Sequence, residues 1–291
     1  KEYVEACQTN DDLQQKVTTY DNEQNKIDLK PLVSKIFDAD DAEPEKKTVD
    51  EDADVKRIPP KPQPITNGKP MNVQDFAAIS APIRAKLEGK NLENCVARVA
   101  LVMDMTGSMR RTYASGVTQD VINKILPLAL QFDDDGQLDF WFYANDYVRR
   151  PSIGLENYQF AVSQNWEDIM NSLGIVNNEP AVMEDVIRNF VQTELPVYVI
   201  FVTDGGAVYS RRIAELLRES SNQPIFWQFV GINGSDYNVF ENLDLITDRF
   251  VNNAAFFAFD DFRRVPDDFL YERLLSEFSV WYKEIQKLGM I

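Results

Sequence analysis

The sequence predicts an α/β protein built on a doubly wound, mostly parallel sheet that is flanked by helices. Two near-continuous apolar runs, residues 95–103 and 197–202, have the composition of strands buried on both faces of a parallel sheet. Strand-like and helix-like segments alternate along the chain after about residue 94. The residues before Asn72 lack this pattern, so we expect a low-order N-terminal extension in front of one large domain.

The first 70 residues are predicted to form an acidic, proline-rich tail or linker. Residues 38–54 are rich in Asp, Glu and Lys, and residues 57–70 contain five prolines and one glycine. Segments of this composition bury too little apolar surface to offset the entropy of the chain. We therefore expect residues 71–291 to be the folded domain, and we expect a protease to cut first between residues 38 and 70.

The first half of the domain alternates between helix and strand. A helix is expected over residues 73–87, followed by the buried strand at residues 95–103. A second helix is expected over residues 117–132, where apolar side chains recur at helical spacing. Residues 138–143 then form a strand, and residues 147–153 pair with it as a short hairpin.

The second half repeats the alternation. Helices are expected at residues 158–173, 181–191, 211–219 and 266–288. Strands are expected at residues 197–202, 225–231 and 256–259. Strands that alternate with helices in this way are typical of a parallel sheet with crossover connections.

The composition excludes several classes of protein. The net charge of −17 opposes binding to nucleic acid, because phosphate contacts require clustered Lys and Arg. The chain has no histidine, which excludes His-based triads and His-rich metal sites, and Cys7 and Cys95 make neither a disulfide framework nor a zinc site. No stretch approaches the roughly 20 apolar residues of a membrane span. Because residues 1–20 also lack a signal-peptide core, we expect a cytoplasmic protein without direct membrane insertion.

Two of the predicted strands are followed by oxygen-bearing side chains. Asp104, Thr106 and Ser108 alternate directly after the first buried strand, and Asp204 follows the strand at residues 197–202. Ligands of open α/β sheets bind beyond the carboxyl ends of the strands, where these loops gather. Two carboxylates placed there would suffer desolvation and mutual repulsion, and a hard divalent cation removes both costs. Since Mg²⁺ and Ca²⁺ prefer oxygen ligands, the sequence predicts a site for one of these ions.

The spacing resembles the metal-ion-dependent adhesion site, or MIDAS, of von Willebrand factor A (vWA) domains, which have a Rossmann-like fold. That family usually carries Asp-x-Ser-x-Ser in the first loop, and Thr106 preserves the hydroxyl of its middle position. Family members add a threonine from a middle loop, which the matching stretch here, GIVNNEP at residues 174–180, lacks. The resemblance implies that the amide oxygen of Asn177 or Asn178 takes its place, and Glu179 is a further candidate.

The chain is still more similar to the TerF-like vWA branch of the bacterial tellurium-resistance proteins. Phrases such as ALVMDMTGSM, NNEPAVMEDVI and VIFVTDGG carry this resemblance, which spans roughly residues 95–290. It implies a cytoplasmic module of stress response or of tellurite and toxic-anion resistance. The metal of such a module binds the Asp or Glu carboxylate of a protein partner, and other stress-resistance proteins are possible partners. The resemblance implies no reaction, so we expect a binding module and no enzyme.

Three alternatives stay open at the level of the sequence. Asp104 and Asp204 could cap the helices that follow them. A metal-free scaffold would make the hydroxyl residues incidental. The enzymatic alternative is a Mg²⁺-dependent phosphatase similar to the haloacid dehalogenases, which place an aspartate nucleophile after the first strand. Those enzymes usually carry Asp-x-Asp-x-Thr, and the position of their second aspartate is Thr106 here, which cannot act as an acid or base.

Overall fold

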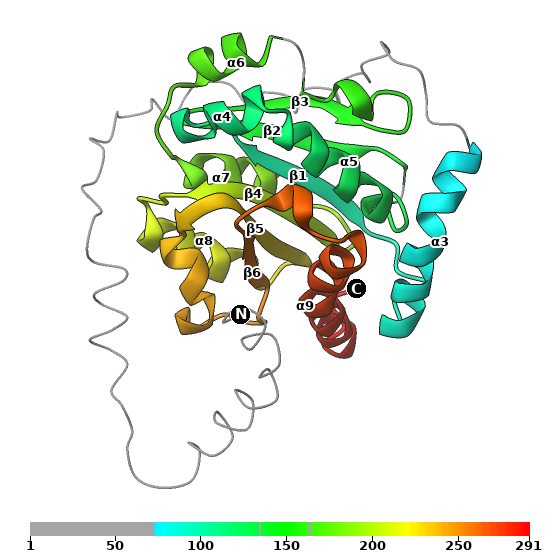
Figure 1. Ribbon diagram of the computed structural model, residues 1–291. Coiled ribbons are helices and arrows are strands. Elements are labelled where there is room, and N and C mark those ends of the chain that lie inside the picture. Colours follow the sequence, from blue (N-terminus) through cyan, green and yellow to red (C-terminus); the bar gives the residue numbers. More distant parts are fainter. Residues whose placement is uncertain (1–72, 134, 163–164) are drawn as a thin grey trace, which may run out of the picture. The chain divides into compact units, whose positions relative to one another are not determined.

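The computed structural model describes residues 73–291, apart from residues 134 and 163–164. The expected tail, residues 1–70, lies outside the described residues. Within them, a six-stranded sheet has the order β3-β2-β1-β4-β5-β6 (Figure 1). Its strands are β1 (Arg98–Asp104), β2 (Leu138–Tyr143), β3 (Tyr147–Ile153), β4 (Val197–Gly205), β5 (Ile225–Asp236) and β6 (Ala254–Phe259). All neighbours are parallel except β2 and β3, which form the antiparallel hairpin, so the predicted doubly wound sheet is confirmed.

Strand β1 lies at the centre of the sheet, where the direction of the winding changes. It pairs with β2 on one side and with β4 on the other, and both pairs are parallel. The loops after β1 and β4 therefore leave the same edge of the sheet and separate toward opposite faces. This topological switch point is where open α/β sheets form a ligand crevice.

Helices cover both faces of the sheet (Figure 1). One face carries α3 (Val73–Lys90), α5 (Val117–Ala129) and α9 (Asp267–Lys287). The other carries α7 (Glu179–Phe190), α8 (Ser210–Ser220) and the 3₁₀ segment η4 (Asn238–Leu245). The shorter elements are η2 (Gly107–Met109), α4 (Arg110–Ala114), η3 (Tyr158–Phe160), α6 (Trp166–Leu173) and η5 (Phe262–Arg264).

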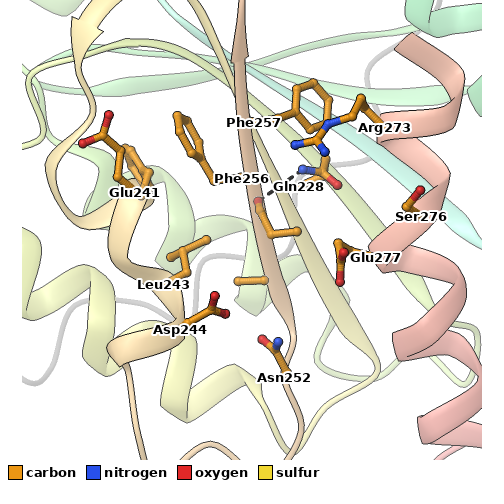
Figure 2. Close-up of a pocket in the computed structure, with 13 residues that line it drawn as sticks. Gln228, Glu241, Leu243, Asp244, Asn252, Phe256, Phe257, Arg273, Ser276 and Glu277 are labelled. Carbon is orange, nitrogen blue, oxygen red and sulfur yellow. Dashed lines mark hydrogen bonds between the residues drawn. The ribbon is translucent and has the colours of Figure 1, made fainter. Parts of the chain in front are cut away.

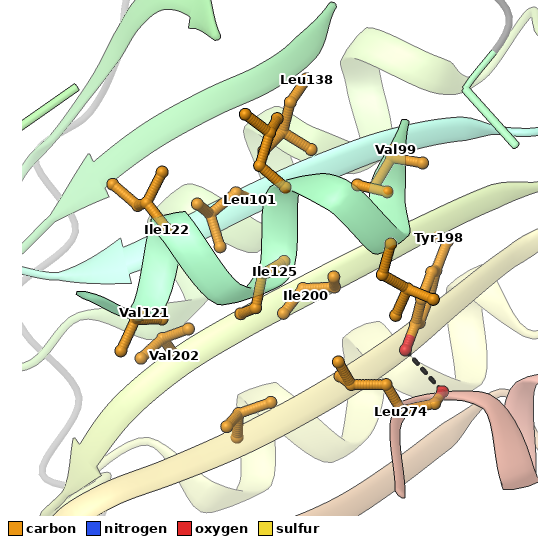
Figure 3. Packing of buried hydrophobic residues seen from close by; sticks show 14 of the residues in the cluster. Val99, Leu101, Val121, Ile122, Ile125, Leu138, Tyr198, Ile200, Val202 and Leu274 are labelled. Carbon is orange, nitrogen blue, oxygen red and sulfur yellow. Dashed lines mark hydrogen bonds between the residues drawn. The ribbon is translucent and has the colours of Figure 1, made fainter. Parts of the chain in front are cut away.

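Alternation along the strands explains why both faces are apolar. On β4, Tyr198, Ile200 and Val202 lie in the core beneath α5 and α9 (Figure 3). The intervening Phe201 faces the opposite layer, where its ring contacts Phe240 of η4. Each of these side chains is fully buried, and burying one such side chain stabilises the fold by roughly 1.5–3 kcal/mol.

The tyrosine hydroxyl in this core is also satisfied. Tyr198 donates to the carbonyl oxygen of Leu274 in α9 at 2.7 Å (Figure 3). A buried hydroxyl without an acceptor would be costly, so this bond fixes the position of α9 against the sheet.

Most expected elements are confirmed, with three differences. The helix expected at residues 158–173 is divided into η3 and α6, and the turn before η3 is held by the buried Asn157, which bonds the backbone of Ser152 and Gly154. Strand β5 extends to Asp236, well beyond residue 231. The elements α4 and η4 were not expected, since each is too short to show a clear apolar period. Among the described helices, none is long and apolar enough to cross a membrane.

Candidate metal centre

Asp104 is the last residue of β1 and lies fully buried at the switch point. Its Oδ1 accepts the backbone N–H of Thr106 at 2.7 Å. Its Oδ2 accepts the hydroxyls of Tyr143, at the end of β2, and Thr203, at the end of β4, at 3.2 and 3.1 Å. Three neighbouring strands therefore hold this carboxylate in one orientation.

A line of oxygens leads from the first loop to Asp204. The hydroxyl oxygens of Thr106 and Ser108 are 3.0 Å apart, and Ser108 donates to Oδ1 of Asp204 at 3.0 Å. Thr106 is buried, Ser108 is exposed, and Asp204 is half-buried. The side chains predicted from the two strand ends are thus brought together at one edge of the sheet.

The turn after β4 depends on glycine. Gly205 has φ +101°, and a Cβ at this position would collide with the carbonyl oxygen of Asp236. Its N–H donates to the hydroxyl of Thr203 at 3.0 Å, while Gly206 donates to the same Asp236 oxygen at 2.8 Å. The long β5 strand therefore supports the loop that presents Asp204.

The middle loop reaches the same place. Its Ile175 carbonyl accepts the N–H of Gly107 at 3.1 Å, which ties it to the first loop. Asn177 is buried and donates its amide to the carbonyl oxygen of Gly205 at 2.7 Å, while its own Oδ1 has no hydrogen-bond partner among the described residues. Asn178 is half-buried and donates to the carbonyl oxygen of Asn145 at 2.9 Å, so its amide supports the loop.

Glu179 begins α7 directly beneath this loop and is fully buried. Neither carboxylate oxygen has a hydrogen-bond partner within the part of the chain that the structure describes. Burial, and then the negative charge of Asp104, raises the pKa of Glu179 to about 8. A buried carboxylate without a partner is costly, and a nearby cation is the most direct way to stabilise it.

The other two carboxylates are also destabilised in their charged form. Burial, followed by the charge of Asp204, raises the pKa of Asp104 to about 7. Burial likewise raises the pKa of Asp204, against the opposing effect of the Ser108 hydrogen bond. The electrostatics of the site thus favour either protons or a cation near these carboxylates.

The donor set fits a hard divalent ion. Hydroxyl and carboxylate oxygens from the loops after β1 and β4 lie within hydrogen-bond distance of one another, and Glu179 and Asn177 of the middle loop hold buried oxygens without partners among the described residues. Among the described residues no cluster of three or more His, Cys, Asp or Glu side chains is close enough to chelate a metal. A site here must therefore include the neutral hydroxyls of Thr106 and Ser108, as Mg²⁺ and Ca²⁺ sites can.

Three supporting residues were not predicted. Tyr143 and Thr203 donate to the Asp104 carboxylate, and Tyr113 donates to the Asp104 carbonyl oxygen at 2.9 Å. Thr203 stands in the Thr-Asp-Gly motif and could have been found there. The two tyrosines look like ordinary core aromatics in the sequence, and only strand pairing and helix packing bring them to the site.

Residues 96–291 match the family model vWA-TerF-like, described as the vWA domain found in the TerF C terminus. An uncharacterized protein of Bacillus subtilis strain 168, YcbR, is 37% identical over 214 residues, which cover 72% of this chain and 87% of the relative.

Solved structures with a similar fold share little sequence with this chain. BatB from Bacteroides thetaiotaomicron is 13% identical with a TM-score of 0.42, covering 66% of this chain and 99% of that protein. The ArnB paralog VWA2 from Sulfolobus acidocaldarius is 16% identical with a TM-score of 0.38, covering 57% of this chain and 42% of that protein. Proximal thread matrix protein 1 from the mussel byssus, solved with a zinc-occupied MIDAS motif, is 17% identical with a TM-score of 0.40; the match covers 66% of this chain and 51% of that one.

Proposed function

The chain belongs to the TerF-like vWA family, and from this premise we propose that it is a metal-ion-dependent module that binds a protein partner. The observation that carries the proposal is the continuous line of oxygens from Thr106 through Ser108 to Asp204, above the buried carboxylate of Asp104. Capping alone would not need the buried Asp104 and the half-buried Asp204 at one point, nor buried oxygens on Asn177 and Glu179 that lack partners among the described residues.

Each group would have a separate role toward the ion. Ser108, Thr106 and Asp204 would supply oxygens at the open edge of the sheet, and Asp104 would hold the ion's inner side. Asn177 and Glu179 are the candidates for the middle loop, where the usual threonine is absent. When bound, the metal supplies a positive charge with one open coordination position, which attracts a carboxylate.

Both Mg²⁺ and Ca²⁺ are compatible with this set of donors, because both prefer carboxylate, hydroxyl and amide oxygens. The Thr106–Ser108 and Ser108–Asp204 oxygen pairs are each 3.0 Å apart, which is an ordinary hydrogen-bond distance, and either ion would replace these bonds. We therefore propose a Mg²⁺ or Ca²⁺ site, with Mg²⁺ as the ion for its tests.

The partner would be a protein that offers an Asp or Glu carboxylate. Three exposed aliphatic side chains lie on the loops of the site: Ile175 and Val176 on the middle loop are 64% and 49% exposed, and Val208 after β4 is 39% exposed. Apolar side chains exposed around a polar centre are typical of a binding surface. Hydroxyl ligands in place of further carboxylates leave the ion electrophilic enough to retain such an anion.

We propose binding without turnover. A phosphatase of the haloacid dehalogenase type needs an acid or base at the position of Thr106, and a hydroxyl group cannot act in that way. The sequence contains no histidine that could replace it. We also propose, from the family alone, a cytoplasmic role in tellurite or stress resistance with other resistance proteins as partners.

Titration calorimetry with Mg²⁺ tests the site directly. Asp104→Asn and Thr106→Ala should each weaken Mg²⁺ binding by tenfold or more, because the first removes a negative charge and the second removes an oxygen ligand, while Thr106→Ser should retain it. Asp248→Asn is the matched control, since Asp248 is an exposed carboxylate whose side chain, among the described residues, bonds only Thr247. Equal affinities in wild type, Asp104→Asn and Asp248→Asn would refute the site.

The open coordination position can be tested with Mn²⁺ in place of Mg²⁺. Water-proton relaxation should show an exchangeable water on the bound Mn²⁺, and acetate should displace it while acetamide should not. A steady hydrolysis of p-nitrophenyl phosphate that disappears in Asp104→Asn would contradict binding without turnover. For the stress role, a strain lacking the gene should regain tellurite tolerance with wild type but not with Asp104→Asn.

A further inference from the structure

Strand β6 is an edge strand whose outer side is open to pairing within the described residues. The N–H of Trp227 in β5 donates to the carbonyl oxygen of Asn253 at 2.8 Å. The backbone N–H and C=O groups of the odd-numbered residues in this segment therefore point toward β5. Ala254, Phe256 and Ala258 therefore direct their N–H and C=O groups outward. The strand reads AAFFAF, without the charge, proline or bulge by which edge strands usually avoid a new partner.

A cavity of about 230 Å³ follows this edge and lies on both sides of the strand (Figure 2). On one side η4 contributes Glu241 and Asp244. On the other side α9 contributes Arg273 and Glu277. An added strand would thus lie between a 3₁₀ segment and a helix, with its alternate side chains pointing to each.

The charge of this groove is acidic. Its ionisable lining consists of three carboxylates, Glu241, Asp244 and Glu277, and one guanidinium, Arg273. Within the described part of the chain, none of the three carboxylates forms an ion pair, although Arg249 interacts electrostatically with Asp244. The Arg273 guanidinium stacks 5.4 Å over the ring of Phe257. Since the lining has more carboxylates than cations, basic side chains would find carboxylate partners on both sides of the strand.

A buried glutamine beside the groove is a second, independent observation that points to a ligand with a hydrogen-bond donor. Gln228 of β5 is fully buried and lines the groove on the α9 side. Its amide nitrogen donates to the carbonyl oxygen of Ala255 at 3.2 Å (Figure 2), but its Oε1 has no partner among the described residues. A buried amide oxygen without a donor is costly, so a donor from a bound ligand would stabilise it.

We propose that the edge of β6 binds an extended peptide segment of a partner through strand addition, and that this segment carries two adjacent basic residues. Successive side chains of an added strand point to opposite faces. One basic residue would therefore meet Glu241 and Asp244, and the next would meet Glu277 and donate to Gln228. The outward backbone of β6 supplies affinity, and the two acidic sides supply specificity.

A second copy of this chain is the weaker occupant. Pairing two β6 edges would bring two sets of three groove carboxylates together, and juxtaposed like charges oppose association. The groove contains none of the proposed metal ligands, so this inference does not depend on the metal-dependent function.

Fluorescence anisotropy with the full chain in excess chelator tests the proposal. The probe is a labelled peptide with the sequence Thr-Val-Thr-Lys-Lys-Val-Thr-Val, and its control replaces both lysines with glutamates. The lysine peptide should bind at least tenfold more tightly than the glutamate peptide. The double variant Glu241→Lys/Asp244→Lys should lose at least tenfold of that affinity.

Two variants of one exposed residue separate strand addition from simple charge attraction. Ala258→Pro removes an outward N–H, whereas Ala258→Ser retains it, so only the proline variant should lose binding. Circular-dichroism spectra and melting temperatures of both variants that match those of wild type would show that the domain is folded. The proposal is overturned if wild type binds neither peptide, if both peptides bind alike, or if Ala258→Pro binds as well as Ala258→Ser. Self-association of wild type that Ala258→Pro abolishes would assign the edge to a second copy and overturn it too.

Discussion

At the scale of single residues, Glu179 differs most from what the site's motifs imply. The family pattern would place a hydroxyl in the middle loop, but this chain has the buried Asn177 at that position, and it buries a carboxylate two residues later. A fully buried carboxylate with two unpartnered oxygens beside Asp104 would weaken a metal-free protein. Its presence is understandable if it contacts the ion or a water on the ion.

Replacing Glu179 with glutamine tests this role. Glu179→Gln keeps the shape but removes the charge, so Mg²⁺ affinity measured by calorimetry should fall by tenfold or more. Glu184→Gln on the same helix is the matched control, because Glu184 is half-exposed and pairs with Arg212 at the surface. Equal Mg²⁺ affinity in the two variants would show that Glu179 has no part in metal binding.

The carboxylates also predict how stability depends on pH. Their folded-state pKa values, about 7 for Asp104 and about 8 for Glu179, lie above the ordinary values of 3.8 and 4.5. Between about pH 5 and 8 the metal-free folded protein thus binds more protons than the unfolded chain, and its free energy of unfolding decreases as pH rises.

Thermal melts from pH 5 to 8.5 measure this effect. The melting temperature of the metal-free protein should fall across the range, and saturating Mg²⁺ should reduce the fall because it replaces the protons. The decisive comparison is between the slopes of melting temperature against pH with and without Mg²⁺. If the two slopes are identical, the groups that titrate are not at the metal site.

The residues of the first and last loops could be predicted because they follow their strands directly in the chain. Asp104, Thr106, Ser108 and Asp204 needed only two buried strands in one parallel sheet to become neighbours. The hydrogen bond from Tyr143 to Asp104 could not be predicted, because it depends on the register that places these two residues opposite each other in β2 and β1.

At the scale of elements, sequence patterning predicted the six strands and both ends of β2 and β3, but not both ends of any of the other four strands. Strand β5 continues through Gly231 and Gly234 to Asp236, where polar residues replace the apolar run. Gly234 lies so close to the carbonyl group of Asp204 that a Cβ would collide with it. This extension is stabilised by tertiary contact with the β4 loop, and no local sequence pattern encodes such a contact.

The β4 turn should therefore be sensitive to the loss of glycine. Gly205→Ala should lower the free energy of unfolding by about 2 kcal/mol or more, from the positive φ and the collision with Asp236, and should weaken Mg²⁺ binding. Urea denaturation measures the first effect and calorimetry the second. In contrast, Gly89→Ala has open space around its Cβ inside α3, so it should be neutral or slightly stabilising. A Gly205→Ala variant as stable as Gly89→Ala would contradict this account of the turn.

At the scale of the whole molecule, the apolar core and the metal site have opposite effects on stability. Both faces of the sheet are covered by fully buried aromatic and aliphatic side chains, and the centre of its carboxyl edge holds three carboxylates with raised pKa values. Burial of the apolar core offsets the free energy that the buried carboxylates of such a site cost the fold. Sites built for binding often reduce the stability of the fold that carries them.

This opposition predicts opposite outcomes for one substitution with and without metal. Asp104→Asn removes a buried charge, so without metal at pH 8 its melting temperature should exceed that of wild type. With Mg²⁺ at 100 times the dissociation constant of wild type, wild type should gain about 2.7 kcal/mol, or roughly 5–10 °C for a domain of this size, while a variant that binds at least tenfold more weakly should gain at most about 1.4 kcal/mol. Differential scanning calorimetry measures all four states, and the order of the two proteins should reverse when Mg²⁺ is added. If wild type is the more stable protein without metal, Asp104 is a structural carboxylate stabilised by Thr106, Tyr143 and Thr203, and the cost assigned to the site is wrong.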